Sequence, residues 1–159
     1  MTPGKKQRWL TTWVPHRLEM LLSPAWQAVP RPLHKLIERL EIEHLRHGGF
    51  ENGHLFVSYQ QFVDYGISKR SIRPTLALGE ALKLIKVDRV EEVGGGNLRP
   101  PNRYGLTFTP LKGKREPGDE WRQVSKQQAE TALEAYRQAT APGSAACSDA
   151  DQTARRNAA

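Results

Sequence analysis

The sequence predicts a small mixed α+β domain in which three helices precede a two-stranded β-hairpin. Apolar residues recur at helical spacing over 31–47 and again over 68–84, whereas they alternate with polar residues over 85–93 and 103–110. Glycines and serine caps separate these stretches from one another. A chain of 159 residues has room for one domain of this kind with a tail on each side.

The N-terminal residues 1–17 are predicted to form a basic arm, and the domain is predicted over 18–110. Lys5, Lys6 and Arg8 all precede the first acidic residue of the chain. The arm has no long apolar segment and no small-residue cleavage site, so it is not interpreted as a secretion signal.

The clearest helix is predicted over 31–47. Residues three and four positions apart make its apolar face, namely Leu33, Leu36, Ile37, Leu40 and His44. The charged residues, Arg39 among them, are expected mostly on the other faces. Ser23 is expected to cap a shorter helix before it, with Pro24 at the first helical position.

A short strand candidate, "HLFVS", is followed by two further helices, a short one over 59–65 and a longer one over 68–84. Ser58 and Gln61 have the spacing of a capping box at the start of the short helix. Ser68 is expected to cap the longer helix. Two short helices joined by a glycine-containing turn make a helix-turn-helix unit.

Pro74 falls inside the longer predicted helix, where a proline removes a hydrogen bond and costs roughly 3 kcal/mol. Two arrangements accommodate it. Either residues 69–73 form a separate or kinked turn, or the long helix begins at Pro74. Both arrangements leave Lys69, Arg70 and Arg73 at the leading end, but they aim these side chains differently.

The hairpin is predicted from the alternation in "LIKVDRVEEV" and "RYGLTFTP", with Tyr104, Leu106 and Phe108 on one face. The polar segment 111–124 contains Pro and Gly and is predicted to be a linker. A separate C-terminal helix is predicted over 125–140, with a second capping box at Ser125 and Gln128. Its thin apolar edge is expected to consist of Ala129, Ala132, Leu133 and Tyr136. The last segment, 141–159, has almost no large apolar residue and is predicted to be disordered.

The order of these elements places basic residues where a helix-turn-helix unit contacts DNA. In such a unit the first residues of the second helix reach base edges in the major groove. The residues expected there are Ser68, Lys69, Arg70, Ser71 and Arg73, with Thr75 reaching a phosphate. Further contacts to the flanking backbone or minor groove are expected from Asn97, Arg99 and Arg103 in the hairpin and from Lys5, Lys6 and Arg8 in the arm.

Residues 23–110 resemble a winged helix-turn-helix DNA-binding domain. The stretches "SPAW", "NG" before a strand, "VSYQQFVDYGISKRSI" and "ALGEALKLI" are similar to those of small winged-helix proteins of bacterial chromosomes, plasmids and phages, including the N-terminal domains of replication proteins. The resemblance implies a three-helix core with a β-hairpin wing. It implies sequence-specific binding of double-stranded DNA by a bacterial transcriptional regulator, or by a plasmid or phage replication or partition factor at an origin.

Composition and motifs argue against several other classes. A net charge of +7 favours an anionic partner, and a single cysteine excludes an internal disulfide. No catalytic constellation or cofactor motif is present, and His44 and His47 lack the second cluster that a metal site needs. No apolar run approaches the length of a membrane span, so no membrane segment is expected. Taken together, these features lead us to expect a cytoplasmic, nucleoid-associated protein that is not an enzyme and needs no cofactor.

Four alternatives remain open at this stage. The basic residues after Ser68 can be a solvated helix start, and Arg99 and Arg103 can balance Glu91 and Glu92 across the hairpin. The winged helix can act only as a protein–protein interaction module. The C-terminal helix can form a homodimer or dock a protein partner.

Overall fold

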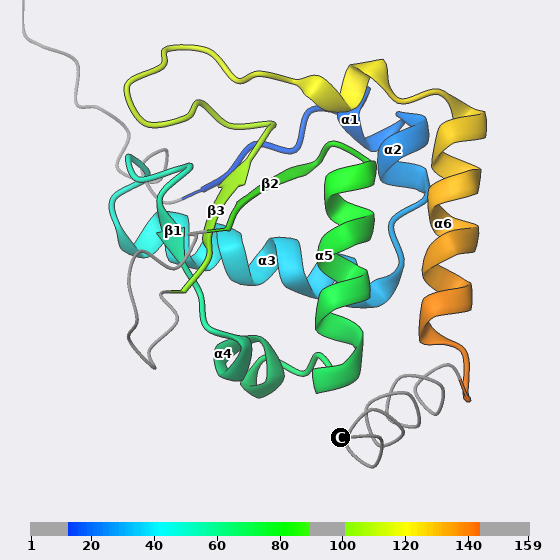
Figure 1. Ribbon diagram of the computed structural model, residues 1–159. Coiled ribbons are helices and arrows are strands. Elements are labelled where there is room, and N and C mark those ends of the chain that lie inside the picture. The colour runs from blue at the N-terminus through cyan, green and yellow to red at the C-terminus, as the bar shows by residue number, and fades with distance from the viewer. Residues whose placement is uncertain (1–12, 90–100, 144–159) are drawn as a thin grey trace, which may run out of the picture.

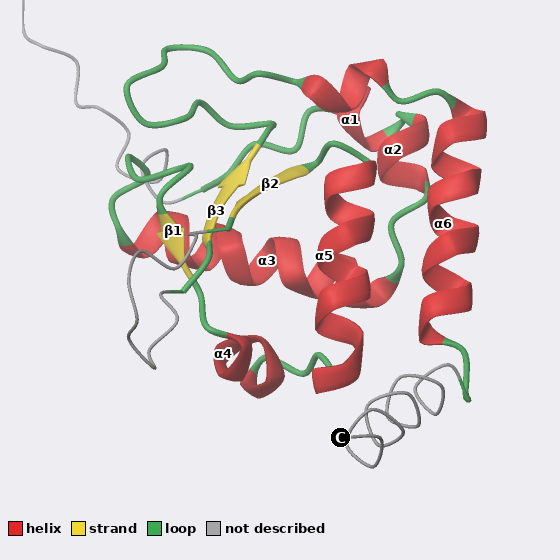
Figure 2. Ribbon diagram, in the orientation of Figure 1, coloured by secondary structure: helices red, strands yellow, loops and turns green. Residues whose placement is uncertain are grey.

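The computed structural model describes residues 13–89 and 101–143 (Figures 1 and 2). The helices, in chain order, are α1 (Leu18–Leu21), α2 (Pro24–Gln27), α3 (Arg31–Arg46), α4 (Tyr59–Asp64), the 3₁₀ turn η2 (Lys69–Ser71), α5 (Ile72–Ala81), the 3₁₀ turn η3 (Glu120–Gln123) and α6 (Lys126–Thr140). The strands are β1 (Leu55–Phe56), β2 (Ile85–Asp88) and β3 (Arg103–Leu106). The mixed α+β class is confirmed. Of the predicted basic arm, hairpin tip and disordered tail, residues 1–12, 90–100 and 144–159 lie outside the described residues. Residues 13–17 of the predicted arm are described, and Val14 packs against the core while His16 and Arg17 pair with Glu41 and Asp119.

Helix α3 has the apolar face that the sequence predicts. All five predicted residues of that face, His44 included, are buried. Arg39 differs from the prediction because it is buried as well, whereas we expected it on a charged face. Its guanidinium lies 2.9 Å from the Glu43 carboxylate one turn later, and this partner offsets the cost of removing the charge from water.

The sheet has three antiparallel strands in the order β1-β3-β2, so β3 is central. The predicted hairpin is confirmed as the pair β2 and β3, in which Ile85 lies opposite Leu106 and Asp88 opposite Arg103. Strand β1 adds to the other edge of β3, with Leu55 opposite Tyr104. Helices α3 and α5 pack against the sheet, and the predicted inward residues of β3 belong to this shared core.

Asn52 ties the turn before β1 to the end of β3. Its Oδ1 accepts a hydrogen bond from the Leu106 backbone N–H at 2.7 Å, and its Nδ2 donates to the Leu106 carbonyl at 2.8 Å and to the Thr109 carbonyl at 3.0 Å. Asn52 is itself buried. The carboxamide therefore satisfies backbone groups that water cannot reach at this position.

The segment 111–124 is not the free linker that we predicted. The Asp119 N–H donates to the Thr107 carbonyl at 2.9 Å, and Trp121 is only 3% exposed within the core. Burial of Trp121, and of Val124 after it, helps to hold this otherwise polar segment on the domain, because it removes apolar area from water.

Helix α6 is likewise part of the domain and is not a separate element. Ser125 and Gln128 form the predicted capping box. The predicted apolar edge of α6 packs against the core, and the helix lies beside α5 and contacts α2 (Figure 1). The apolar edge that we considered for a homodimer or a protein partner is therefore occupied within the chain.

Candidate functional site

The turn between α4 and α5 presents the predicted basic cluster. The capping box of Ser58 and Gln61 starts α4 as predicted, and Gly66, with φ of +96°, turns the chain after it in a conformation that favours glycine. Ser68 does not cap the following helix with its side chain. Its hydroxyl instead lies 2.6 Å from the Ser71 hydroxyl across the short turn η2.

Pro74 causes no interruption, because it is the third residue of α5. The first four N–H groups of a helix have no partner within that helix, so a proline among them removes no interior hydrogen bond. Residues 69–71 form a separate 3₁₀ turn, close to the first of the two arrangements considered above. Helix α5 begins at Ile72 and ends at Ala81, earlier than the predicted end near Leu84.

The leading end of α5 divides into buried and exposed residues. Lys69, Arg70 and Arg73 are exposed, and Ser71 is partly exposed. Ile72 and Leu76 are buried, as expected of the residues that fix the helix on the core.

The prediction that Thr75 reaches a phosphate is wrong, because Thr75 is 0% exposed. Helix α5 packs against α3, β2 and α6, so its surface is covered on more sides than a three-helix core would cover it. Threonine is short enough to be enclosed completely.

The three cations at the start of α5 have no nearby counterion among the described residues. Within residues 13–89 and 101–143, no carboxylate pairs with Lys69, Arg70 or Arg73, and none of these side chains makes a hydrogen bond. Ion pairs to carboxylates do form at other arginines, namely Arg17, Arg39, Arg89, Arg122 and Arg137. The start of α5 is therefore a site of uncompensated positive charge that an anion can approach.

The other residues predicted to contact DNA do not join this cluster within the described part of the chain. Arg103 is the first residue of β3, opposite Asp88 in the strand pair next to the hairpin tip, and its guanidinium carbon lies 5.5 Å from the centroid of the Phe56 ring. Asn97, Arg99, Lys5, Lys6 and Arg8 lie outside the described residues.

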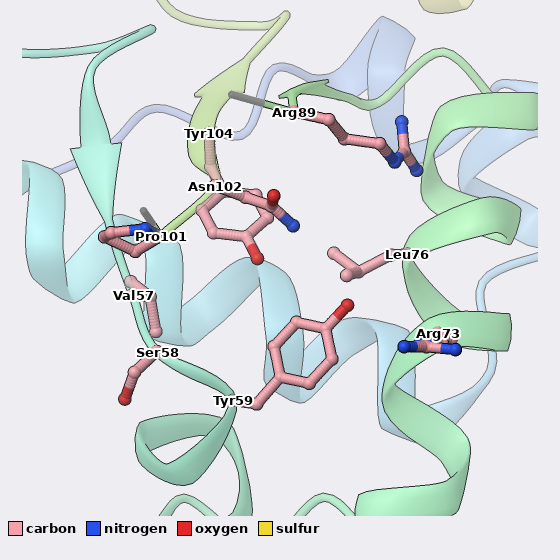
Figure 3. Close-up of a pocket in the computed structure, with 9 residues that line it drawn as sticks. All are labelled: Val57, Ser58, Tyr59, Arg73, Leu76, Arg89, Pro101, Asn102 and Tyr104. Carbon is pink, nitrogen blue, oxygen red and sulfur yellow. The ribbon is translucent and has the colours of Figure 1, made fainter. Parts of the chain in front are cut away.

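Beside Arg73 lies a pocket of about 570 Å³ that the sequence did not predict (Figure 3). Its polar walls come from the start of α4, from α5, from the residue after β2 and from the start of β3, and include Tyr59, Arg73, Arg89, Asn102 and Tyr104. Its apolar walls include Val57, Leu76 and Pro101. These residues are distant in sequence, and no local spacing connects them.

Two features set the electrostatics of the pocket. Arg89 donates to both carboxylate oxygens of Glu80, at 2.9 and 2.7 Å, and the hydrogen bond with Glu80 raises the pKa of Arg89. Burial raises the pKa of Tyr104 to about 12, so its hydroxyl stays protonated at neutral pH. Tyr104 is 1% exposed, and its hydroxyl makes no hydrogen bond of ordinary geometry with a described residue, although the nearby Asn102 side chain acts to lower its pKa.

Comparison with known proteins adds no family to this description: no protein-family model, no curated protein and no solved structure matches the chain. The described residues contain no group of three or more His, Cys, Asp or Glu side chains that could hold a metal ion. Over the same part of the chain, no helix combines the length and the apolar character needed to cross a membrane.

Proposed function

We propose that this chain is a winged-helix protein that binds double-stranded DNA in a sequence-specific manner, as a bacterial transcriptional regulator on the nucleoid. The order α3, β1, α4, α5, β2, β3 supports this fold, since a helix pair joined by a tight turn is followed at once by a hairpin. The central strand β3 and the edge strand β1 complete the small sheet behind that pair.

One observation carries the function. Lys69, Arg70 and Arg73 stand exposed, without carboxylate partners among the described residues, at the leading end of the second helix of the pair. This end is the part of a helix-turn-helix unit that enters the major groove. Arginine there pairs with guanine through two hydrogen bonds, and each such pair is worth about 1–3 kcal/mol of discrimination between bases.

The test is selection of bound duplexes from a random pool by the purified full chain, followed by sequencing. We expect one enriched motif, and we expect Arg70→Ala to lose preference at one position of it. Enrichment without a common motif would contradict sequence-specific binding. Absence of any salt-dependent affinity would instead favour a module that binds only proteins.

The distribution of sites in the host genome then separates a regulator from a replication factor. Footprinting on the element that encodes the protein is expected to protect a single promoter site. Iterated sites at an origin would instead identify a replication or partition factor.

A further inference from the structure

The pocket beside Arg73 is lined by Tyr104, whose buried hydroxyl has no partner of ordinary hydrogen-bond geometry among the described residues. The Tyr104 ring packs edge-on against Phe62, with centroids 5.7 Å apart, and phenylalanine would supply the same contact. A buried hydroxyl that makes no hydrogen bond destabilises the ligand-free fold. In Figure 3 the hydroxyls of Tyr104 and Tyr59 both point into the pocket, so they are placed to donate to a bound group.

The charges around the pocket favour an anion. Arg73 lines the same pocket and has no carboxylate partner among the described residues. Arg89 lines the wall, but its charge is already matched by Glu80, whose two oxygens are both engaged by that guanidinium. Glu80 is not among the lining residues. Among the described residues that line the pocket, Arg73 is therefore a cation without a carboxylate partner, and several neutral donors lie beside it.

The size and walls of the pocket restrict the anion further. A phosphate group accepts hydrogen bonds on several oxygens at once, which suits donors that arrive from α4, α5 and β3. A volume of about 570 Å³ is within the range of organic-ligand sites and exceeds what inorganic phosphate needs. Leu76, Val57 and Pro101 offer apolar surface to the remainder of a larger ligand.

We propose that this pocket binds the phosphate group of a phosphate ester. Arg73 pairs with the phosphate, the hydroxyls of Tyr59 and Tyr104 donate to it, and the carboxamide of Asn102 contributes a further donor. The ester is either a backbone phosphate of DNA or a free phosphorylated small molecule. Binding of a DNA phosphate in this pocket rests on the proposed function, whereas binding of a free phosphate ester does not.

The experiment is an NMR titration of the full chain with inorganic phosphate and with adenosine monophosphate, alongside DNA binding by fluorescence anisotropy. Tyr104→Phe and Arg73→Gln are compared with Arg115→Gln, an exposed arginine of the segment 111–124. We expect saturable shifts of the pocket resonances with at least one of the two small probes. A charge-assisted hydrogen bond is worth about a 10- to 100-fold change in affinity, and we expect each pocket variant to lose binding on that scale.

The same variants identify the source of the phosphate. If DNA supplies it, Tyr104→Phe weakens DNA binding in the absence of small probes. If a free ester supplies it, Tyr104→Phe leaves DNA binding unchanged and weakens only the small probe. Either result supports the site, and the second does so even if the chain binds no DNA.

The thermal stability of Tyr104→Phe separates a ligand contact from a structural role. Loss of an unpartnered hydroxyl is expected to raise Tm or leave it unchanged while binding falls. The proposal is overturned if neither small probe shifts the pocket resonances and Tyr104→Phe binds DNA as Arg115→Gln does, whatever Arg73→Gln does through its place in the exposed cluster. Normal DNA binding in that case leaves the proposed function standing.

Discussion

Replacing Lys69 and Arg70 together by alanine should flatten the salt dependence of DNA binding. Both side chains are exposed and neither has a carboxylate partner among the described residues, so their full charge is available to DNA phosphates. Each phosphate contact contributes a slope of about −0.9 to the logarithm of affinity against the logarithm of salt concentration. Removal of two contacts should therefore reduce the magnitude of the slope by about 1.8.

The expected size of the effect follows directly from that slope. Over a rise from about 50 mM to about 200 mM salt, the wild-type chain should lose about 12-fold more affinity than the double variant. Fluorescence anisotropy with a selected duplex measures both slopes. Circular dichroism on the same samples checks that the fold is retained, as expected for exposed positions.

A matched control removes two cations from the opposite end of the molecule. Arg115 is exposed in the segment after β3, and Lys126 is exposed at the start of α6. These segments lie at the top of Figure 1, whereas α5 begins at the bottom. If Arg115→Ala with Lys126→Ala flattened the slope equally, net charge alone would explain binding and the interface assigned to α5 would be wrong.

Three further predictions concern the fold. Trp121→Ala should cost about 3–5 kcal/mol of unfolding free energy by chemical denaturation, since the ring is 3% exposed; no change would mean that its segment is a free linker after all. Asn52→Ala should cost about 2–4 kcal/mol in the same assay, because it leaves buried backbone groups of Leu106 unpaired. The hydrogen bond of His16 with Glu41, at 2.5 Å, raises the pKa of His16. The contribution of this pair to the free energy of unfolding is therefore complete below the unfolded pKa of about 6.5, and it disappears as pH rises through the higher folded pKa. The stability difference between wild type and His16→Ala should therefore shrink, by under about 1 kcal/mol, from pH 6 to pH 9, and a constant difference would refute the ion pair.

Local features of the sequence predicted most of the elements correctly. The capping boxes at Ser58 and Ser125, and the cap at Ser23, depend on residues three positions apart. Their geometry is nearly independent of the rest of the chain. The apolar face of α3 was equally predictable, since one dominant stripe of large residues must face the core.

The errors occur where a residue's surroundings come from distant segments. Thr75 lies on a helix that α3, β2 and α6 cover together, and its own neighbours in sequence do not reveal this. Trp121 is one aromatic residue in a polar stretch, so its burial depends wholly on where the segment crosses the domain. The pocket is the extreme case, since Tyr59, Arg73 and Tyr104 come from α4, α5 and β3.

Arg73 links the two parts of the candidate site. It belongs to the exposed cation cluster at the start of α5 and also lines the pocket with Tyr104, whose hydroxyl has no hydrogen-bond partner of ordinary geometry among the described residues. A phosphate group in the pocket would neutralise one of the three cations that the proposed DNA interface presents. A free phosphate ester and DNA would then compete for the same guanidinium. Such competition would make DNA affinity depend on the concentration of the ester through charge alone, without any rearrangement of the fold.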